Sequence, residues 1–109
     1  MIKKINIFSV EYTIEYCDKP SDVDINKRTS MWGQIDYWSR TIRIYKGIQK
    51  TDIMVTIIHE VIHGIMDHLN LDTYITEDNE GFVDTLATGL VDTLMRNNLI
   101  SEKAFTTQK

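Results

Sequence analysis

The sequence predicts an α+β domain in which a small, mostly antiparallel sheet of three or four strands is followed by two long helices. Two observations favour this class. Apolar and polar residues alternate through much of the first 45 positions, as in half-buried strands, and the apolar spacing becomes helical afterwards. A length of 109 residues fits one core. We therefore expect a single domain over residues 1–100, followed by a flexible polar tail at residues 101–109.

The first segment with strand-like alternation is KINIFSVEYTIEYC, residues 4–17. Every second residue is apolar on each side of Phe8 and Ser9, so the segment is either one long bent strand or a hairpin that turns at these two residues. The polar stretch that follows, CDKPSDVDINKRTS, contains the only proline of the chain, Pro20. Its composition predicts a loop.

The alternation returns in WGQIDYWSRTIRIY, residues 32–45. It predicts two more strands, at residues 33–37 and 41–45, which are joined by a turn near Ser39 and Arg40. Together with the first segment, these strands are expected to form the sheet.

Two long helices are expected after the strands. The first has its N-cap at Thr51 or Asp52 and ends at Asn70. The second begins near Thr76, with acidic residues in its first turn that the helix dipole favours, and ends near residue 97 or 98. Its core-facing stripe is expected to comprise Phe82, Val83, Leu86, Ala87, Leu90, Val91 and Leu94.

The first helix carries a histidine pair in the pattern His59-Glu60-x-x-His63. Residues four apart on a helix lie about 40° apart around its axis and one turn apart in height. Both imidazoles can therefore bind one metal ion, while Glu60 projects beside them toward a metal-bound water. The helix is apolar on most sides, so its polar stripe is expected to line a cleft.

Catalytic zinc usually takes three protein ligands, so the histidine pair needs a partner. His68 is excluded because it lies about 140° around the helix from His63. On the second helix Glu80 lies nearest the apolar stripe, and a carboxylate directed toward a core is costly unless it is paired or metal-bound. Glu80 is therefore the preferred third ligand. Asp84 and Glu77 remain alternatives, and Asp84 could instead accept a hydrogen bond from a histidine ring.

Composition excludes several classes of partner. The net charge is −4 and the basic residues are scattered, which argues against binding to nucleic acid or to an anionic membrane. The chain has no apolar run of about 20 residues and no apolar signal-peptide segment. Cys17 is the only cysteine, so no internal disulfide can form and the cytoplasm is the expected compartment. The sequence does not indicate an oligomeric state.

Three stretches resemble a known family: GQIDYWSRTIRI, TIIHEVIHGIMDHL and NEGFVDTLATGLVDTL. They are similar to small phage and prophage zincin-like proteins related to the ImmA/IrrE metallopeptidases, over roughly residues 5–98. The specific features are HExxH and a downstream E-x-x-[AV]-x-x-[LF]-A pattern, whose acidic ligand falls on Glu80. The resemblance implies a minimal zincin-like domain with a gluzincin-type core, in the host cytoplasm if the gene is a phage gene. Gly64 stands where alanine is more usual, a change that would admit close packing.

These observations and the resemblance together suggest a zinc-dependent peptidase. His59, His63 and Glu80 would hold Zn²⁺, and Glu60 would act as general base on a metal-activated water. The substrate would be a protein or peptide that lies extended along a strand of the sheet. The alternative is a binding or inhibitor protein that keeps the fold without proteolysis, because so short a chain leaves little wall to determine specificity.

Overall fold

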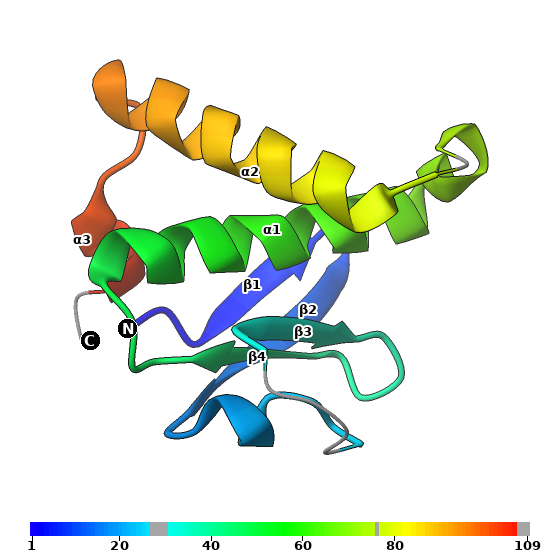
Figure 1. Ribbon diagram of the computed structural model, residues 1–109, viewed down its shortest axis with the longest axis horizontal. Coiled ribbons are helices and arrows are strands. Elements are labelled where there is room, and N and C mark those ends of the chain that lie inside the picture. Colours follow the sequence, from blue (N-terminus) through cyan, green and yellow to red (C-terminus); the bar gives the residue numbers. More distant parts are fainter. Residues whose placement is uncertain (27–30, 76, 107–109) are drawn as a thin grey trace.

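In the computed structural model, which describes residues 1–26, 31–75 and 77–106, a four-stranded sheet is covered by α1, and α1 is covered by α2 (Figure 1). The α+β class predicted from the sequence is confirmed. The elements in chain order are β1 (Lys4–Ile7), β2 (Val10–Cys17), η1 (Pro20–Asp22), β3 (Gly33–Asp36), β4 (Thr41–Tyr45), α1 (Lys50–His68), η2 (Leu71–Tyr74), α2 (Asn79–Arg96) and α3 (Glu102–Thr106), where η denotes a 3-10 helix.

The sheet has the strand order β1-β2-β4-β3 and mixes two pairing modes. β1 and β2 form an antiparallel hairpin, which turns at Phe8 with a φ of 56°. β3 and β4 form a second hairpin, which turns near Arg40 with a φ of 54°. The central pair, β2 and β4, is parallel. The turns predicted from alternation are therefore confirmed, and β3 is left at an edge of the sheet.

The main core lies between the sheet and α1. Ile42 and Ile44 on β4 and Met54 and Ile57 on α1 are each 0% exposed. The period-two spacing of the isoleucines places both on the face that α1 covers. α1 approaches closely at Gly64, where an added Cβ would lie 2.5 Å from Cδ1 of Ile7. The close packing expected at this glycine is confirmed.

The helix ends differ slightly from those predicted. α1 begins two or three residues earlier than expected: its N-cap is Gln49, which makes no side-chain capping hydrogen bond. α2 begins at Asn79, since Asp78 is its N-cap and accepts a hydrogen bond from the Gly81 N–H at 2.8 Å. Thr76, where this helix was expected to begin, lies outside the described residues.

The core-facing stripe of α2 is narrower than predicted. Val83, Ala87 and Val91 are buried against α1. The other apolar positions are wrong as core residues, because α2 lies in an outer layer and packs mainly on one neighbouring helix. Three of them are 40% exposed or more: Phe82 (47%), Leu86 (45%) and Leu90 (40%).

The polar tail is not frayed where it is described. Residues Glu102–Thr106 form α3, and Phe105 is 8% exposed within the core between the sheet and α1. The Ile2 N–H donates a hydrogen bond to the Phe105 carbonyl at 3.2 Å. The prediction of a flexible tail from residue 101 is wrong for this helix, because one aromatic side chain in a polar segment is enough to anchor it. Residues 107–109 lie outside the described part of the chain.

None of the helices in the described part of the chain combines the length and the hydropathy that crossing a bilayer requires. The longest, α1, interrupts its apolar residues with the polar stripe that contains the histidine pair.

Candidate metal centre

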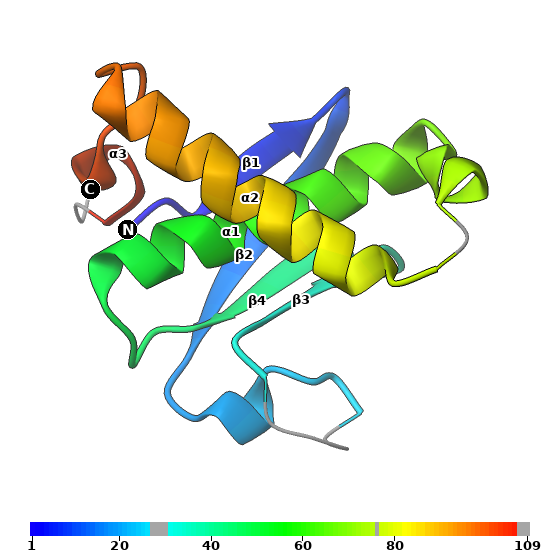
Figure 2. The ribbon, with the colours of Figure 1, turned by 45° about the horizontal axis from the view of Figure 1, so that its top comes forward.

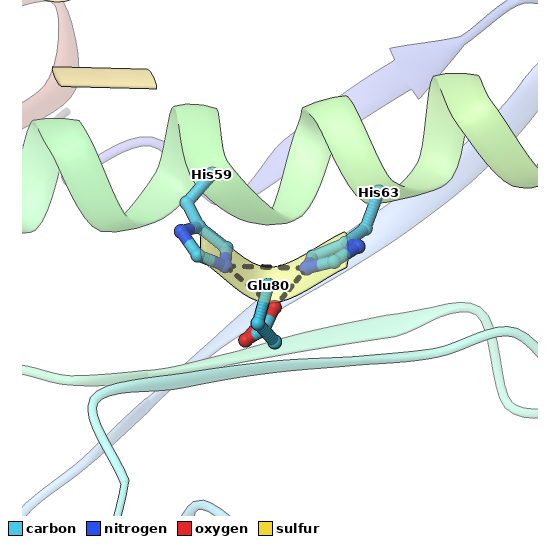
Figure 3. Close-up of side chains that lie close together, drawn as sticks. All are labelled: His59, His63 and Glu80. Carbon is cyan, nitrogen blue, oxygen red and sulfur yellow. Dashed lines mark hydrogen bonds and ion pairs between the residues drawn. The ribbon is translucent and has the colours of Figure 1, made fainter. Parts of the chain in front are cut away.

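Two imidazoles and one carboxylate meet between α1 and α2 (Figure 3). The Nε2 atoms of His59 and His63 are 3.2 Å apart, and Glu80 Oε1 lies 3.0 Å from the His59 Nε2 and contacts the His63 Nε2. These three ligand atoms all lie within 4.8 Å of one another. The structure thus brings together the three residues that the sequence selected, and they form a group that could hold a metal ion.

Local structure explains why the three side chains converge. His59 and His63 are one turn apart on α1 and project from the same face, as the four-residue spacing requires. Glu80 lies in the first turn of α2, whose start is set by the Asp78 cap. Val83, one turn further along, is buried against α1 and holds the beginning of α2 close to the histidines.

The reason that the sequence offered for Glu80 is only partly right. Its side chain is 70% exposed and lies at the rim of a cleft, whereas the packing argument placed it toward the core. Partial burial would raise the pKa of the Glu80 carboxyl, but its contacts with His59 and His63 outweigh this effect and lower it. The ionised form is therefore the one that the histidines favour.

The donor set fits a divalent cation. If each histidine carries its proton on Nδ1, two imidazole lone pairs and a carboxylate oxygen face a single point, and a positive charge there removes their mutual repulsion. Asp84 favours this tautomer at His59, because its Oδ1 lies 3.5 Å from the His59 Nδ1, the nitrogen that faces away from Glu80. Asp84 is therefore not in the ligand group, but its carboxylate lies close to the ring nitrogen that faces away from that group.

Glu60 is buried beside this group. Its residue is 6% exposed, and Oε2 lies 3.9 Å from the His59 Nε2. The pKa of the Glu60 carboxyl is raised from 4.5 to about 7: burial raises it most and nearby Glu80 also raises it, and together they outweigh His59 and a hydrogen bond with the Ile35 backbone, which lower it. A buried carboxyl with a pKa near neutrality is suited to accept and release a proton.

Glu80, Glu60 and His59 line a cavity of about 340 Å³. Its walls come from three elements: Trp32 and Gly33 at the start of β3, Val55 and Thr56 on α1, and Thr88 on α2. Of the polar stripe of α1 that the sequence predicted to line a cleft, Thr56, His59 and Glu60 do so.

Thr56 belongs to the polar stripe that the helical spacing predicted. It is 8% exposed, and its hydroxyl donates to the Asp52 carbonyl at 2.7 Å. Gly33, in contrast, was not predicted to line the cleft. An added Cβ at Gly33 would lie 2.6 Å from Cγ2 of Thr56 and 3.1 Å from Oε2 of Glu60. The spacing of residues in the sequence could not predict this position of Gly33, because Gly33 comes close to Thr56 and Glu60 only when β3 packs against α1.

The remaining sequence candidates lie elsewhere. The His68 ring stacks on the Phe8 ring with their centroids 4.3 Å apart, which confirms that it is not a ligand. Glu77 is exposed and does not belong to the ligand group among the described residues. The Tyr37 hydroxyl donates to the His63 carbonyl at 3.2 Å and so supports the helix backbone.

Comparison with known proteins adds no family to this geometry. No protein-family model, curated protein or solved structure matches the chain. The functional conclusion therefore depends on the geometry and chemistry of the cleft.

Proposed function

We propose that this protein is a zinc-dependent peptidase in which His59, His63 and Glu80 bind the metal and Glu60 is the general base. The main support for this proposal is that the imidazoles of His59 and His63 meet the Glu80 carboxylate, while the buried carboxyl of Glu60 lies in the same cleft. Two histidines and a glutamate are a donor set of hydrolytic zinc sites, which keep one position open. When bound, Zn²⁺ lowers the pKa of a coordinated water to about 7 and polarises a carbonyl oxygen.

Glu60 supplies the proton transfers in this proposal. It lies next to His59 in the chain and does not join the ligand group, so its carboxylate is free to take a proton from the attacking water. The same oxygen then returns the proton to the leaving amine. Because burial raises the Glu60 pKa to about 7, and a nearby cation lowers it again, the group can be ionised before the reaction and protonated during it.

The edge strand β3 supports a peptide as the substrate. It pairs with β4 on one side only, and Gly33 at its start lines the cleft. An extended peptide can add backbone hydrogen bonds at such an edge and present its carbonyl to the metal centre. This agrees with the resemblance to ImmA/IrrE-like zincins and with a protein substrate in the cytoplasm.

One observation favours the alternative, a zincin-fold binding protein without proteolysis. Among the described residues that line the cleft there is no tyrosine, lysine or arginine that could stabilise a developing oxyanion. If the protein is a peptidase, stabilisation of the oxyanion would therefore have to come from the bound metal. In the alternative, the same edge strand captures a partner that is not cleaved.

The Glu60→Gln variant separates the two functions. We expect it to retain zinc and to lose about 10²- to 10⁴-fold in the cleavage rate of a peptide library followed by mass spectrometry. Glu77→Gln, which removes an exposed carboxylate outside the cleft, should cleave at the wild-type rate. If Glu60→Gln cleaves as fast as wild type, the peptidase proposal is wrong. A zinc-loaded wild-type protein that binds peptides without cleaving them favours the alternative.

A further inference from the structure

α2 forms the layer furthest from the sheet (Figure 2). It carries a row of partly exposed apolar side chains. Phe82, Leu86 and Leu90 are spaced four residues apart, so they form one ridge on the helix surface. Each is between 40% and 47% exposed. Such a ridge is unfavourable in water, because burying each exposed methylene group would stabilise the protein by about 0.8 kcal/mol.

The ridge borders an apolar groove of about 460 Å³. Met66 on α1, Leu71 and Tyr74 on η2, and Phe82 and Leu86 on α2 contribute to its lining, in which the Tyr74 hydroxyl is the only polar side-chain group. The metal cleft opens on the other side of α2, where Asp84 and Thr88 line it. Groove and ridge therefore form a surface separate from the metal centre.

The chain as a whole exposes more area than a typical folded monomer of its mass. The chain exposes 7066 Å². A folded monomer of 12.7 kDa is expected to expose about 6,200 Å². The difference is close to the roughly 800 Å² that each partner buries in a protein interface of standard size.

We propose that α2 packs antiparallel against α2 of a second copy of this chain. The two-fold axis of this dimer passes close to Leu86, so the Leu86 side chains of the two copies contact each other. Phe82 of each copy then contacts Leu90 of the other copy. The even four-residue spacing makes the ridge complementary to itself, which a partner of another sequence would not require. The two copies thereby cover the same apolar surface for each other.

Charge at the two ends of α2 favours the same arrangement. Glu77 and Asp78 stand at its beginning, and Arg96, which also pairs with Asp92 of its own helix, stands in its last turn. An antiparallel pair brings the acidic end of one helix toward the basic end of the other and also opposes the two helix dipoles. A parallel pair would place like charges together.

Sedimentation equilibrium of the zinc-loaded protein tests this dimer. Wild type is expected to show twice the 12.7 kDa chain mass at micromolar concentrations. Leu86→Glu places two carboxylates together on the axis and should weaken dimerisation by more than about 100-fold. Leu99→Glu is the matched control, since Leu99 is 69% exposed but lies beyond α2, and should dimerise like wild type. Unchanged zinc content and circular dichroism will show that both variants fold.

Cross-linking tests the geometry. Leu86→Cys should form a disulfide-linked dimer under mild oxidation, whereas Leu99→Cys should not, and the native Cys17 is buried. A wild-type protein that stays monomeric throughout the concentration range overturns the proposal. So does a dimer that Leu86→Glu leaves intact. A monomer whose Leu86-dependent surface binds a hydrophobic dye also overturns it and indicates a different partner. None of these results depends on peptidase activity.

Discussion

At the scale of single residues, the His59 ring shows how the centre is organised. Its Nε2 faces Glu80 at 3.0 Å, and its Nδ1 faces Asp84 at 3.5 Å. In the proposed centre the first nitrogen would be the ligand atom and the second would carry the proton, which it could donate to Asp84. Helical spacing predicted His59 and His63, but it could not assign Asp84, because the choice between ligand and positioning residue depends on the direction of the ring.

The role of Asp84 can be tested through zinc affinity. Asp84→Asn should weaken zinc binding by about 10- to 100-fold, because a neutral amide oxygen is a weaker acceptor for the His59 Nδ1–H than a carboxylate is, while one zinc per chain still binds at saturation. A competition titration with a chromogenic chelator measures this change. Asp92→Asn is the control, since Asp92 lies on the same helix and pairs with Arg96 instead. Unaltered affinity in Asp84→Asn would refute the positioning role.

Glu60 makes a prediction about the stability of the metal-free protein. Its pKa is raised from 4.5 to about 7 in the folded state, so the folded state binds this proton more tightly than the unfolded chain does. The resulting stabilisation is complete below pH 4.5 and is lost as the pH rises to about 7, by up to about 3 kcal/mol.

Urea unfolding without metal, between these two pH values, measures the effect. The free energy of unfolding of wild type should fall relative to that of Glu60→Gln as the pH rises, because the variant has no proton to release at this position. A constant difference between the two proteins across this range would show that the Glu60 carboxyl is not perturbed.

At the scale of elements, the approach of α1 to its neighbours determines the shape of the cleft. Periodicity alone predicted the helices and the second hairpin, since these patterns are local, and it left the first segment as either a bent strand or a hairpin. It did not predict the parallel pairing of β2 with β4, because that pairing depends on the path of the chain between them. The close contact of α1 with β1 and β3 at Gly64 likewise belongs to the packed structure, although the missing side chain was visible in the sequence.

The contact at Gly64 predicts a clear difference between two helical glycines. Gly64→Ala should destabilise the protein by about 1 to 3 kcal/mol, since the new Cβ would collide with Ile7 and lie within 3.1 Å of Ile35. Gly89→Ala should instead stabilise it by about 0.5 to 1 kcal/mol, because nothing lies within 4 Å and alanine favours the helix. Thermal and urea unfolding measure both. Equal effects would contradict the packing described for α1.

At the scale of the whole molecule, three layers leave the metal cleft and the α2 ridge on opposite sides of one helix. The sequence indicated the cleft because histidines and carboxylates at helical spacing have few other uses. It did not show which apolar residues of α2 would be covered, since hydrophobicity does not reveal whether a neighbouring element exists. For the same reason the anchoring of α3 by Phe105 was missed.

The metal content of the purified protein tests the central claim most directly. Elemental analysis should find about one zinc ion per chain in wild type, none in His59→Ala, and a reduced amount in Glu80→Ala. Glu77→Ala, which removes an exposed carboxylate outside the ligand group, should match wild type. A wild-type protein that retains no zinc, or a zinc content that Glu80→Ala leaves unchanged, would contradict the proposed centre.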